Sequence, residues 1–225
     1  MRYTFSCGLL LVGLLLSPPP ARATANSVAV KASAPSSTVP RIIEPGVRLG
    51  PVSASSTLES LRASLGTRAV SLENVASEDG KSKVSGAVIY PGDSKKRIEV
   101  AWGDTLAKAR PLWARVRNAA SYWRTPAGVR LGSTLLDLEK LNGRAFTVAS
   151  FRAGERRSPI RSWNKGNLAE ELEKNARIWL AVPSSTTKAQ MTPLSQGNIL
   201  PSGDPPLRRL NPHVTEIFIH FVVTS

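Results

Sequence analysis

Two histidines near the C-terminus are the first residues whose spacing can be tested for chemistry. His213 and His220 lie seven residues apart in or beside one predicted strand. Successive side chains of a strand point to opposite faces, so an odd separation prevents both rings from binding one metal ion. The sequence therefore predicts no metal site and no cofactor, and we expect His220 to pack beside Phe218 and Val222 in the core or at an edge.

Paired carboxylates and an activated serine are two further arrangements that would indicate an enzyme. Glu170, Glu171 and Glu173 share one short predicted helix, where a solvated face is the simpler interpretation. No G-x-S-x-G motif marks a nucleophilic serine. The sequence favours a protein without catalytic activity. The alternative is a hydrolase that acts on envelope glycans, or another periplasmic enzyme, which would use acids such as Glu155 or Asp104.

Arginine and tryptophan gather in two stretches, a combination that suits anionic groups and the faces of sugars. Guanidinium groups pair with carboxylates or phosphates and also stack on aromatic rings. In the competing interpretation, the tryptophans belong to the core and the arginines form a solvated rim. The candidate binding surface comprises Arg152, Arg156, Arg157, Arg161, Trp163, Lys165, Trp123 and Arg124.

The charge of the chain also fits an anionic partner. Lysine and arginine total 30 against 16 acidic residues, which gives a formal net charge of +14. Such a surface attracts acidic proteins and envelope polymers, although high charge also serves solubility alone. Nucleic acid is disfavoured as a partner because the chain has no recognisable nucleic-acid-binding motif and its start indicates export.

The first 25 residues have the pattern of a cleavable signal peptide. Arg2 precedes an apolar run at 7–16, and A-x-A sites follow at the expected distance. The prolines at 18–20 interrupt the run before it is long enough to span a membrane. Cys7, the only cysteine, precedes most of the run and so does not mark a lipid anchor. We expect a periplasmic or extracellular protein with no transmembrane segment after cleavage and no disulfide.

The candidate residues must be positioned by the part of the chain that follows residue 45. Residues 26–45 are rich in Ser, Ala, Val and Pro and predict a flexible stalk. Residues 46–225 contain an internal repeat: Gly-Val-Arg-Leu-Gly occurs at 46–50 and 128–132, and each copy is followed by Ser-Thr-Leu-x-x-Leu and then a glycine. The repeat predicts one domain of two related halves, 46–127 and 128–225.

Each half is predicted to contain a short amphipathic helix followed by strands. The helices are indicated by leucines spaced by three or four residues and by a glycine at the end of each. Capping boxes are possible at Ser56 with Glu59 and at Thr134 with Asp137. The whole therefore predicts an α+β fold of tandem helix-plus-antiparallel-sheet repeats. Strands are expected at 84–90, 97–102, 112–117, 144–151, 177–182 and 214–223, a third helix at 167–176, and a long loop at 184–212.

The segment 123–146 resembles a family of uncharacterised exported bacterial proteins. These share W-x-T-P-x-G-[VI]-x-x-G-x-[ST]-L-x-x-L-x-x-x-N-G-x-x-F, which this chain matches from Trp123 to Phe146. The repeat unit is similar, more loosely, to that of the outer-membrane assembly lipoprotein BamE and of the β-lactamase inhibitory proteins. The first resemblance implies no particular activity, and the second implies a protein-binding module with a concave sheet.

Together these patterns favour an exported envelope or secreted binding module that meets an anionic protein or polymer.

Overall fold

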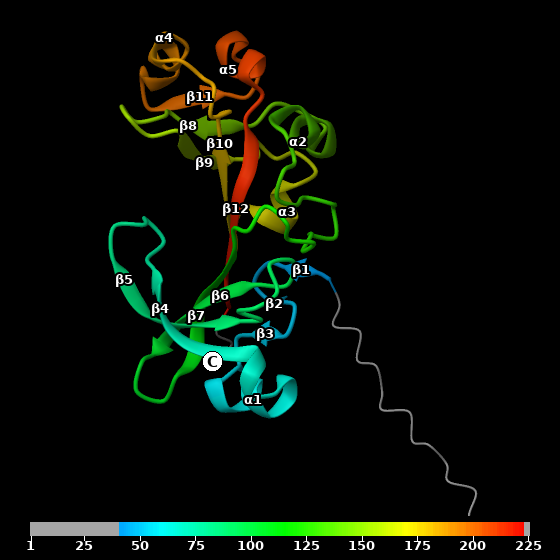
Figure 1. Ribbon diagram of the computed structural model, residues 1–225. Coiled ribbons are helices and arrows are strands. Elements are labelled where there is room, and N and C mark those ends of the chain that lie inside the picture. The colour runs from blue at the N-terminus through cyan, green and yellow to red at the C-terminus, as the bar shows by residue number, and fades with distance from the viewer. Residues whose placement is uncertain (1–40, 223–225) are drawn as a thin grey trace, which may run out of the picture. The chain divides into compact units, whose positions relative to one another are not determined.

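Nine strands form one antiparallel sheet in the computed structural model, which describes residues 41–222 (Figure 1). The strand order is β11-β8-β9-β10-β12-β7-β6-β5-β4, and a separate three-stranded sheet has the order β1-β2-β3. With several short helices, this confirms the α+β class. The predicted signal peptide, 1–25, and most of the predicted stalk lie outside the described residues.

The elements have the following bounds. The strands are β1 Ile43–Glu44, β2 Arg48–Leu49, β3 Val52–Ser53, β4 Val70–Ala76, β5 Lys83–Ile89, β6 Ile98–Asp104, β7 Ala109–Val116, β8 Thr147–Ala149, β9 Arg157–Ser162, β10 Ala176–Ala181, β11 Ile199–Pro201 and β12 His213–His220. The helices are α1 Leu58–Leu65, α2 Leu135–Asn142, α3 Ala169–Leu172, α4 Lys188–Met191 and α5 Pro205–Leu210, with 3-10 turns at Thr67–Ala69 and Thr192–Ser195.

Side-chain caps fix where the two longest helices begin. Thr134 and Asp137 form the predicted capping box at the start of α2. At α1 the box is made by Thr57 and Ser60, whereas the sequence suggested Ser56 with Glu59. Ser56 is instead buried and accepts a hydrogen bond from the backbone N–H of Ser53 at 2.9 Å. The prediction was therefore wrong by one residue, because either of two adjacent hydroxyls could have served as the cap.

The helices all pack against one face of the large sheet. Leu61 of α1, Leu138 of α2 and Leu172 of α3 belong to the same hydrophobic cluster as the inward side chains of β6, β7 and β12. A second, smaller cluster lies on the other face of the sheet. It contains no helical residue and consists of Val75, Val88, Ala101, Trp113 and Phe218, with Val84 and Trp179 packed against it.

Four sequence-based expectations are corrected. The stalk ends earlier than predicted, because Ile43 is fully buried in strand β1. The predicted helix at 167–176 is only the single turn α3, and Asn167 does not cap it. The region 184–212 contains α4, β11 and α5 rather than one long loop. In β7, the alternation of Leu112, Ala114 and Val116 with Trp113, Arg115 and Arg117 predicts a half-exposed strand, but Trp113 and Arg115 are buried as well as Ala114 and Val116, and Leu112 is 57% exposed.

The second face of β7 is buried because the hairpin of β4 and β5 curls over that face of the sheet (Figure 1). Val75 of β4 packs there with Trp113 of β7, so that Trp113 is covered without any helix. Gly86 of β5 permits the curl. A Cβ at this position would lie 2.6 Å from Cγ2 of Val75 and closer still to the carbonyl oxygen of Val100.

We predict that Gly86→Ala lowers the free energy of unfolding by about 1–3 kcal/mol, because the added methyl group forces the hairpin away from the sheet. Thermal unfolding followed by circular dichroism measures the effect. The matched control is Gly92→Ala, where a Cβ meets nothing within 4 Å, and which should change stability by less than about 0.5 kcal/mol. Equal melting temperatures for the two variants would contradict the account of the curl.

Candidate functional site

The face of the large sheet opposite the helices is here called the open face. Its side chains form cross-strand rows, one of which runs through directly paired residues of five neighbouring strands. That row consists of Arg177 on β10, Phe218 on β12, Arg115 on β7, Glu99 on β6 and Val88 on β5. Three of these five side chains are charged and two are apolar.

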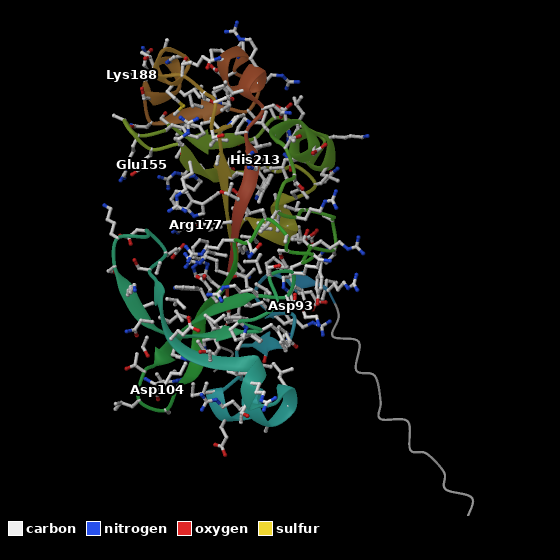
Figure 2. All side chains as sticks on the ribbon, viewed as in Figure 1. Asp93, Asp104, Glu155, Arg177, Lys188 and His213 are labelled. Atoms are coloured by element: carbon white, nitrogen blue, oxygen red, sulfur yellow. The ribbon has the colours of Figure 1, made fainter. Side chains whose placement is uncertain are left out.

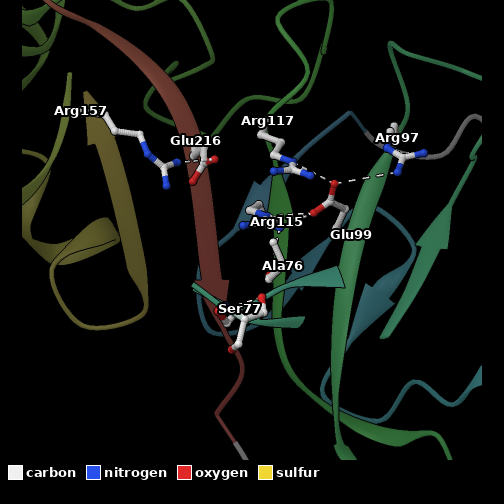
Figure 3. Close-up of polar contacts among 9 residues, drawn as sticks. Ala76, Ser77, Arg97, Glu99, Arg115, Arg117, Arg157 and Glu216 are labelled. Carbon is white, nitrogen blue, oxygen red and sulfur yellow. Dashed lines mark hydrogen bonds and ion pairs between the residues drawn. The ribbon is translucent and has the colours of Figure 1, made fainter. Parts of the chain in front are cut away.

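Arg115 is the centre of this face, although its side chain is only 2% exposed. Its guanidinium lies 5.2 Å from the ring centroid of Trp113 and 4.9 Å from that of Phe218. It donates to the carboxylate of Glu99 through both Nε and Nη2, and Nη2 also donates to the carbonyl oxygen of Ala76 at 3.1 Å (Figure 3). A buried arginine thus joins strand β6 and the end of β4 to the strand that carries it.

A line of alternating charges crosses the open face beside Arg115 (Figure 3). Glu99 also accepts a hydrogen bond from Arg117 at 2.9 Å and lies 3.9 Å from Arg97. Farther along, Glu216 of β12 pairs with Arg157 of β9 at 2.7 Å. Both glutamates are buried while their outer arginines are partly exposed, so the acids hold the arginines in place and the positive groups face solvent.

The turn of the β4–β5 hairpin is anchored to the far half of the sheet through Glu78. Its carboxylate lies 2.5 Å from Nη1 of Arg177 and 3.4 Å from Nε2 of His220. The hydrogen bond with His220, and then the positive charges of Arg177 and Arg115, hold the pKa of Glu78 below its usual value despite partial burial. Glu78 therefore fixes the hairpin turn to β10 and β12, and these contacts of Glu78 are here called the latch.

Beside this latch lies a cleft of about 530 Å³. One wall is the sheet surface of β9 and β10, the second is the hairpin turn, and the third is the loop between β8 and β9. We call it the arginine cleft. Its charged and aromatic lining residues are Arg157, Arg161, Arg177 and Trp179 on the sheet, Glu78, Asp79 and Lys81 on the hairpin, and Arg152 and Glu155 on the loop.

The structure brings three of the eight predicted binding residues together. Arg152, Arg157 and Arg161 all line the arginine cleft, and the guanidinium of Arg157 stacks 5.0 Å above the ring of Trp179. Arg156, the neighbour of Arg157, donates instead to backbone carbonyl oxygens of the segment 183–186.

Lys165 and Arg124 are exposed but lie away from the arginine cleft. Lys165 lies in the loop between β9 and α3 and lines a different pocket, beside Glu170 and Lys174. Arg124 forms backbone bridges to Ile42 and Arg130, and neither residue is among those that line the arginine cleft.

Trp123 and Trp163 belong to the core, which corrects their assignment to a binding surface. Trp123 is fully buried, and its indole N–H donates to the carbonyl oxygen of Lys96 at 3.0 Å. Trp163 is 3% exposed and packs against Phe146 at 5.1 Å between ring centroids. One motif residue between them is also part of the buried structure. Asn142 is buried and accepts a hydrogen bond from the N–H of Leu168.

The acids expected in an enzyme are not brought together. Glu155 lines the arginine cleft, whereas Asp104 lies on the turn after β6, far from Glu155 (Figure 2). Asp104 accepts hydrogen bonds from the backbone of Leu106 and Ala107, which lower its pKa. These bonds give Asp104 a structural role in the turn.

The histidines do not form a metal site in the described part of the chain. They occupy the two ends of β12, and His220 is held by Glu78. Among residues 41–222, no three His, Cys, Asp or Glu side chains gather closely enough to bind a metal ion.

Sequence reasoning missed Trp179, Arg177 and the hairpin acids. The alternations Arg-x-Trp at 177–179 and Arg-x-Pro-x-Arg at 157–161 place these side chains on one face of their strands, and that period was available in the sequence. The Asp79-Gly80 pair was a local sign of the hairpin turn. That this turn reaches β10 and β12 depends on non-local packing.

Comparisons with known proteins identify no family. No family model matches the chain, and no curated protein matches it. Among solved structures, the chain is similar to the uncharacterized protein yfeY from Escherichia coli. That similarity has 16% sequence identity and a TM-score of 0.44, and it covers 79% of this chain and 97% of the other. Within residues 41–222, no helix has the length and apolar character needed to cross a membrane.

We predict that Glu99→Ala lowers the free energy of unfolding by about 3–5 kcal/mol, because it leaves Arg115 charged and buried with no carboxylate. Denaturant unfolding monitored by tryptophan fluorescence measures the loss. The control is Glu73→Ala, an exposed position on β4, which should cost less than about 0.5 kcal/mol. A loss below about 1 kcal/mol for Glu99→Ala would show that Arg115 does not depend on this carboxylate.

We predict that Glu78→Gln removes an acid-sensitive part of the stability. Because the pKa of Glu78 is lowered by folding, its contribution is present above the pKa of the unfolded chain, about 4.3, and is lost as the pH falls through the folded value. The melting temperature of the unaltered protein should therefore fall more between pH 6 and pH 3 than that of the variant. If the melting temperatures of the two proteins fall in parallel with pH, Glu78 does not stabilise the hairpin through its charge.

Proposed function

We propose that this protein is an exported binding module whose arginine cleft, at the β9–β10 end of the open face, receives an anionic partner, either an acidic protein or an envelope polymer. The observation that carries the proposal is that two arginines of the cleft are exposed and have no acidic partner in the described part of the chain. Within residues 41–222, Arg152 and Arg161 make no ion pair, although both are exposed in the cleft. Such planar, permanently charged groups suit carboxylates and phosphates.

The arrangement of the layers supports the same proposal. The helices cover one face of the sheet, and the β4–β5 hairpin covers the part of the other face that carries the second apolar cluster. The surface of β9 and β10, which lines the arginine cleft, is left for a partner. The resemblance to BamE and the β-lactamase inhibitory proteins agrees with a protein-binding sheet. The predicted signal peptide and the basic net charge agree with an exported protein that meets an anionic surface.

We further propose that the two halves arose by duplication. The strand order β4-β5-β6-β7 in one half runs inward from one edge, and on the other side β8-β9-β10-β12 runs inward beside the edge strand β11. The first residue of each long helix is held alike: Leu58 donates to the carbonyl oxygen of Lys108, and Leu135 donates to that of Pro212, both at 2.8 Å. Each acceptor directly precedes the last strand of its half.

Hydrolysis of an envelope glycan is the competing function. Such an enzyme needs one acid that holds a proton and a second carboxylate within about 10 Å. Glu155 lies in the cleft together with Glu78 and Asp79. Glu78 is held by Arg177, and Asp79 is tied into its own turn by bonds to Ser77 and Lys81. These contacts favour binding over catalysis.

We predict that the double variant Arg152→Glu/Arg161→Glu no longer retains the envelope component that the unaltered protein retains. The immobilised protein is incubated with a cell-envelope fraction and washed with increasing salt, which releases partners held by exposed charges. Charge reversal at the cleft replaces attraction by repulsion.

The matched control is Arg124→Glu/Arg130→Glu, which has the same net charge but alters exposed residues outside the cleft. Retention by the control and loss by the cleft variant support the proposal. Equal loss by both variants would mean that the general basicity of the chain is responsible. If the unaltered protein retains nothing, the binding-module proposal fails.

A further inference from the structure

The charges of the arginine cleft are sorted between its walls. The sheet wall contributes Arg157, Arg161 and Arg177 and no acid, whereas the hairpin wall contributes Glu78 and Asp79 together with one lysine. The loop wall contributes one charge of each sign, Arg152 and Glu155. A ligand in this cleft therefore meets positive charge on one side and mostly negative charge on the other.

The charged groups of the cleft can be divided into those that form ion pairs and those that do not. Asp79 belongs to the second group, because the bonds that tie it into its turn engage only its Oδ1. Arg157 is paired with Glu216, and Arg177 is paired with Glu78. In the described part of the chain, Arg152 and Arg161 have no ion-pair partner, and neither do Asp79 and Glu155. The cleft thus presents two arginines and two carboxylates whose charges are not neutralised by ion pairs.

The sheet wall is also opened by the divergence of its two strands. β9 and β10 pair only over Arg157–Pro159 and Trp179–Ala181. Beyond this stretch, Arg161 on β9 and Arg177 on β10 lie on either side of the place where the strands separate, and both line the cleft. Both arginines therefore reach the cleft from the end of the sheet wall where the two strands are no longer paired.

We propose that the arginine cleft binds an extended segment of a partner protein in which acidic and basic side chains alternate. In an extended chain, successive side chains point to opposite sides. Acidic residues on one side then face Arg161 of the sheet wall, and the intervening basic residues face Asp79 of the hairpin wall, while Arg152 and Glu155 of the loop wall offer one contact of each kind. A uniform polyanion gains the first set of contacts but is repelled by the carboxylates. This inference rests on the proposed binding function and specifies its ligand.

Labelled eight-residue peptides test the proposal against the purified full chain. The probes are an alternating Glu-Lys peptide, a peptide of four Glu followed by four Lys, an all-Glu peptide and inorganic polyphosphate. Affinities are measured by fluorescence anisotropy at about 0.3 M salt, where attraction between distant exposed charges is largely screened. The alternating peptide should bind most tightly, although the block peptide has the same composition.

Variants assign the contacts to the two walls. Arg161→Gln should lower the affinity for the alternating peptide about five-fold, because one exposed ion pair is lost. Glu155→Gln should lower the affinity for the alternating peptide and raise the affinity for the all-Glu peptide. A purely structural role of Glu155 would not change the two affinities in opposite directions. Arg124→Gln, outside the cleft, should change neither affinity.

Two outcomes would overturn the inference and leave the binding-module proposal standing. Tighter binding of polyphosphate or the all-Glu peptide would identify a uniform polyanion as the ligand class. Absence of peptide binding, with an envelope component still retained through Arg152 and Arg161, would exclude an extended segment. Failure of the envelope experiment as well would instead remove the proposed function itself.

Discussion

The open face of this protein is organised by the buried guanidinium of Arg115. A charge removed from water is costly unless carboxylates, carbonyl oxygens or aromatic faces replace the lost hydration. Here Glu99 supplies the carboxylate, Ala76 a carbonyl oxygen, and Trp113 and Phe218 the rings. These partners belong to four strands, so satisfying one charge fixes the relative positions of β4, β6, β7 and β12.

That requirement connects the two halves of the sheet and creates the cleft. Arg115 is directly opposite Phe218 across the junction of β7 and β12, and its bond to Ala76 draws the end of β4 over the sheet. Glu78, two residues farther along, then reaches Arg177 in the second half. The arginine cleft consequently has one wall from the first half and its other walls from the second, so neither half contains the site alone.

The sequence predicted local features well and non-local ones poorly. The capping box at Thr134 and the last strand depend on neighbours along the chain. The box is confirmed, and the strand predicted at 214–223 is found at 213–220. The second apolar cluster was not predicted, because Val75 reaches Trp113 only when the hairpin curls at Gly86. A tryptophan next to arginine in sequence gives no indication of which side of a strand is covered.

The candidate site shows the same division. Arg152, Arg157 and Arg161 are close in sequence and meet in the cleft, whereas Glu78 and Trp179 are brought to them from separate strands or turns. The electrostatics of Glu78 and Asp104 do not suit a general acid. A general acid needs a raised pKa so that it keeps its proton near neutral pH. The pKa of Glu78 is lowered by His220 and Arg177, and that of Asp104 by backbone N–H groups. Both acids therefore remain ionised and hold the hairpin and a turn, while Arg152 and Arg161 remain available to a partner.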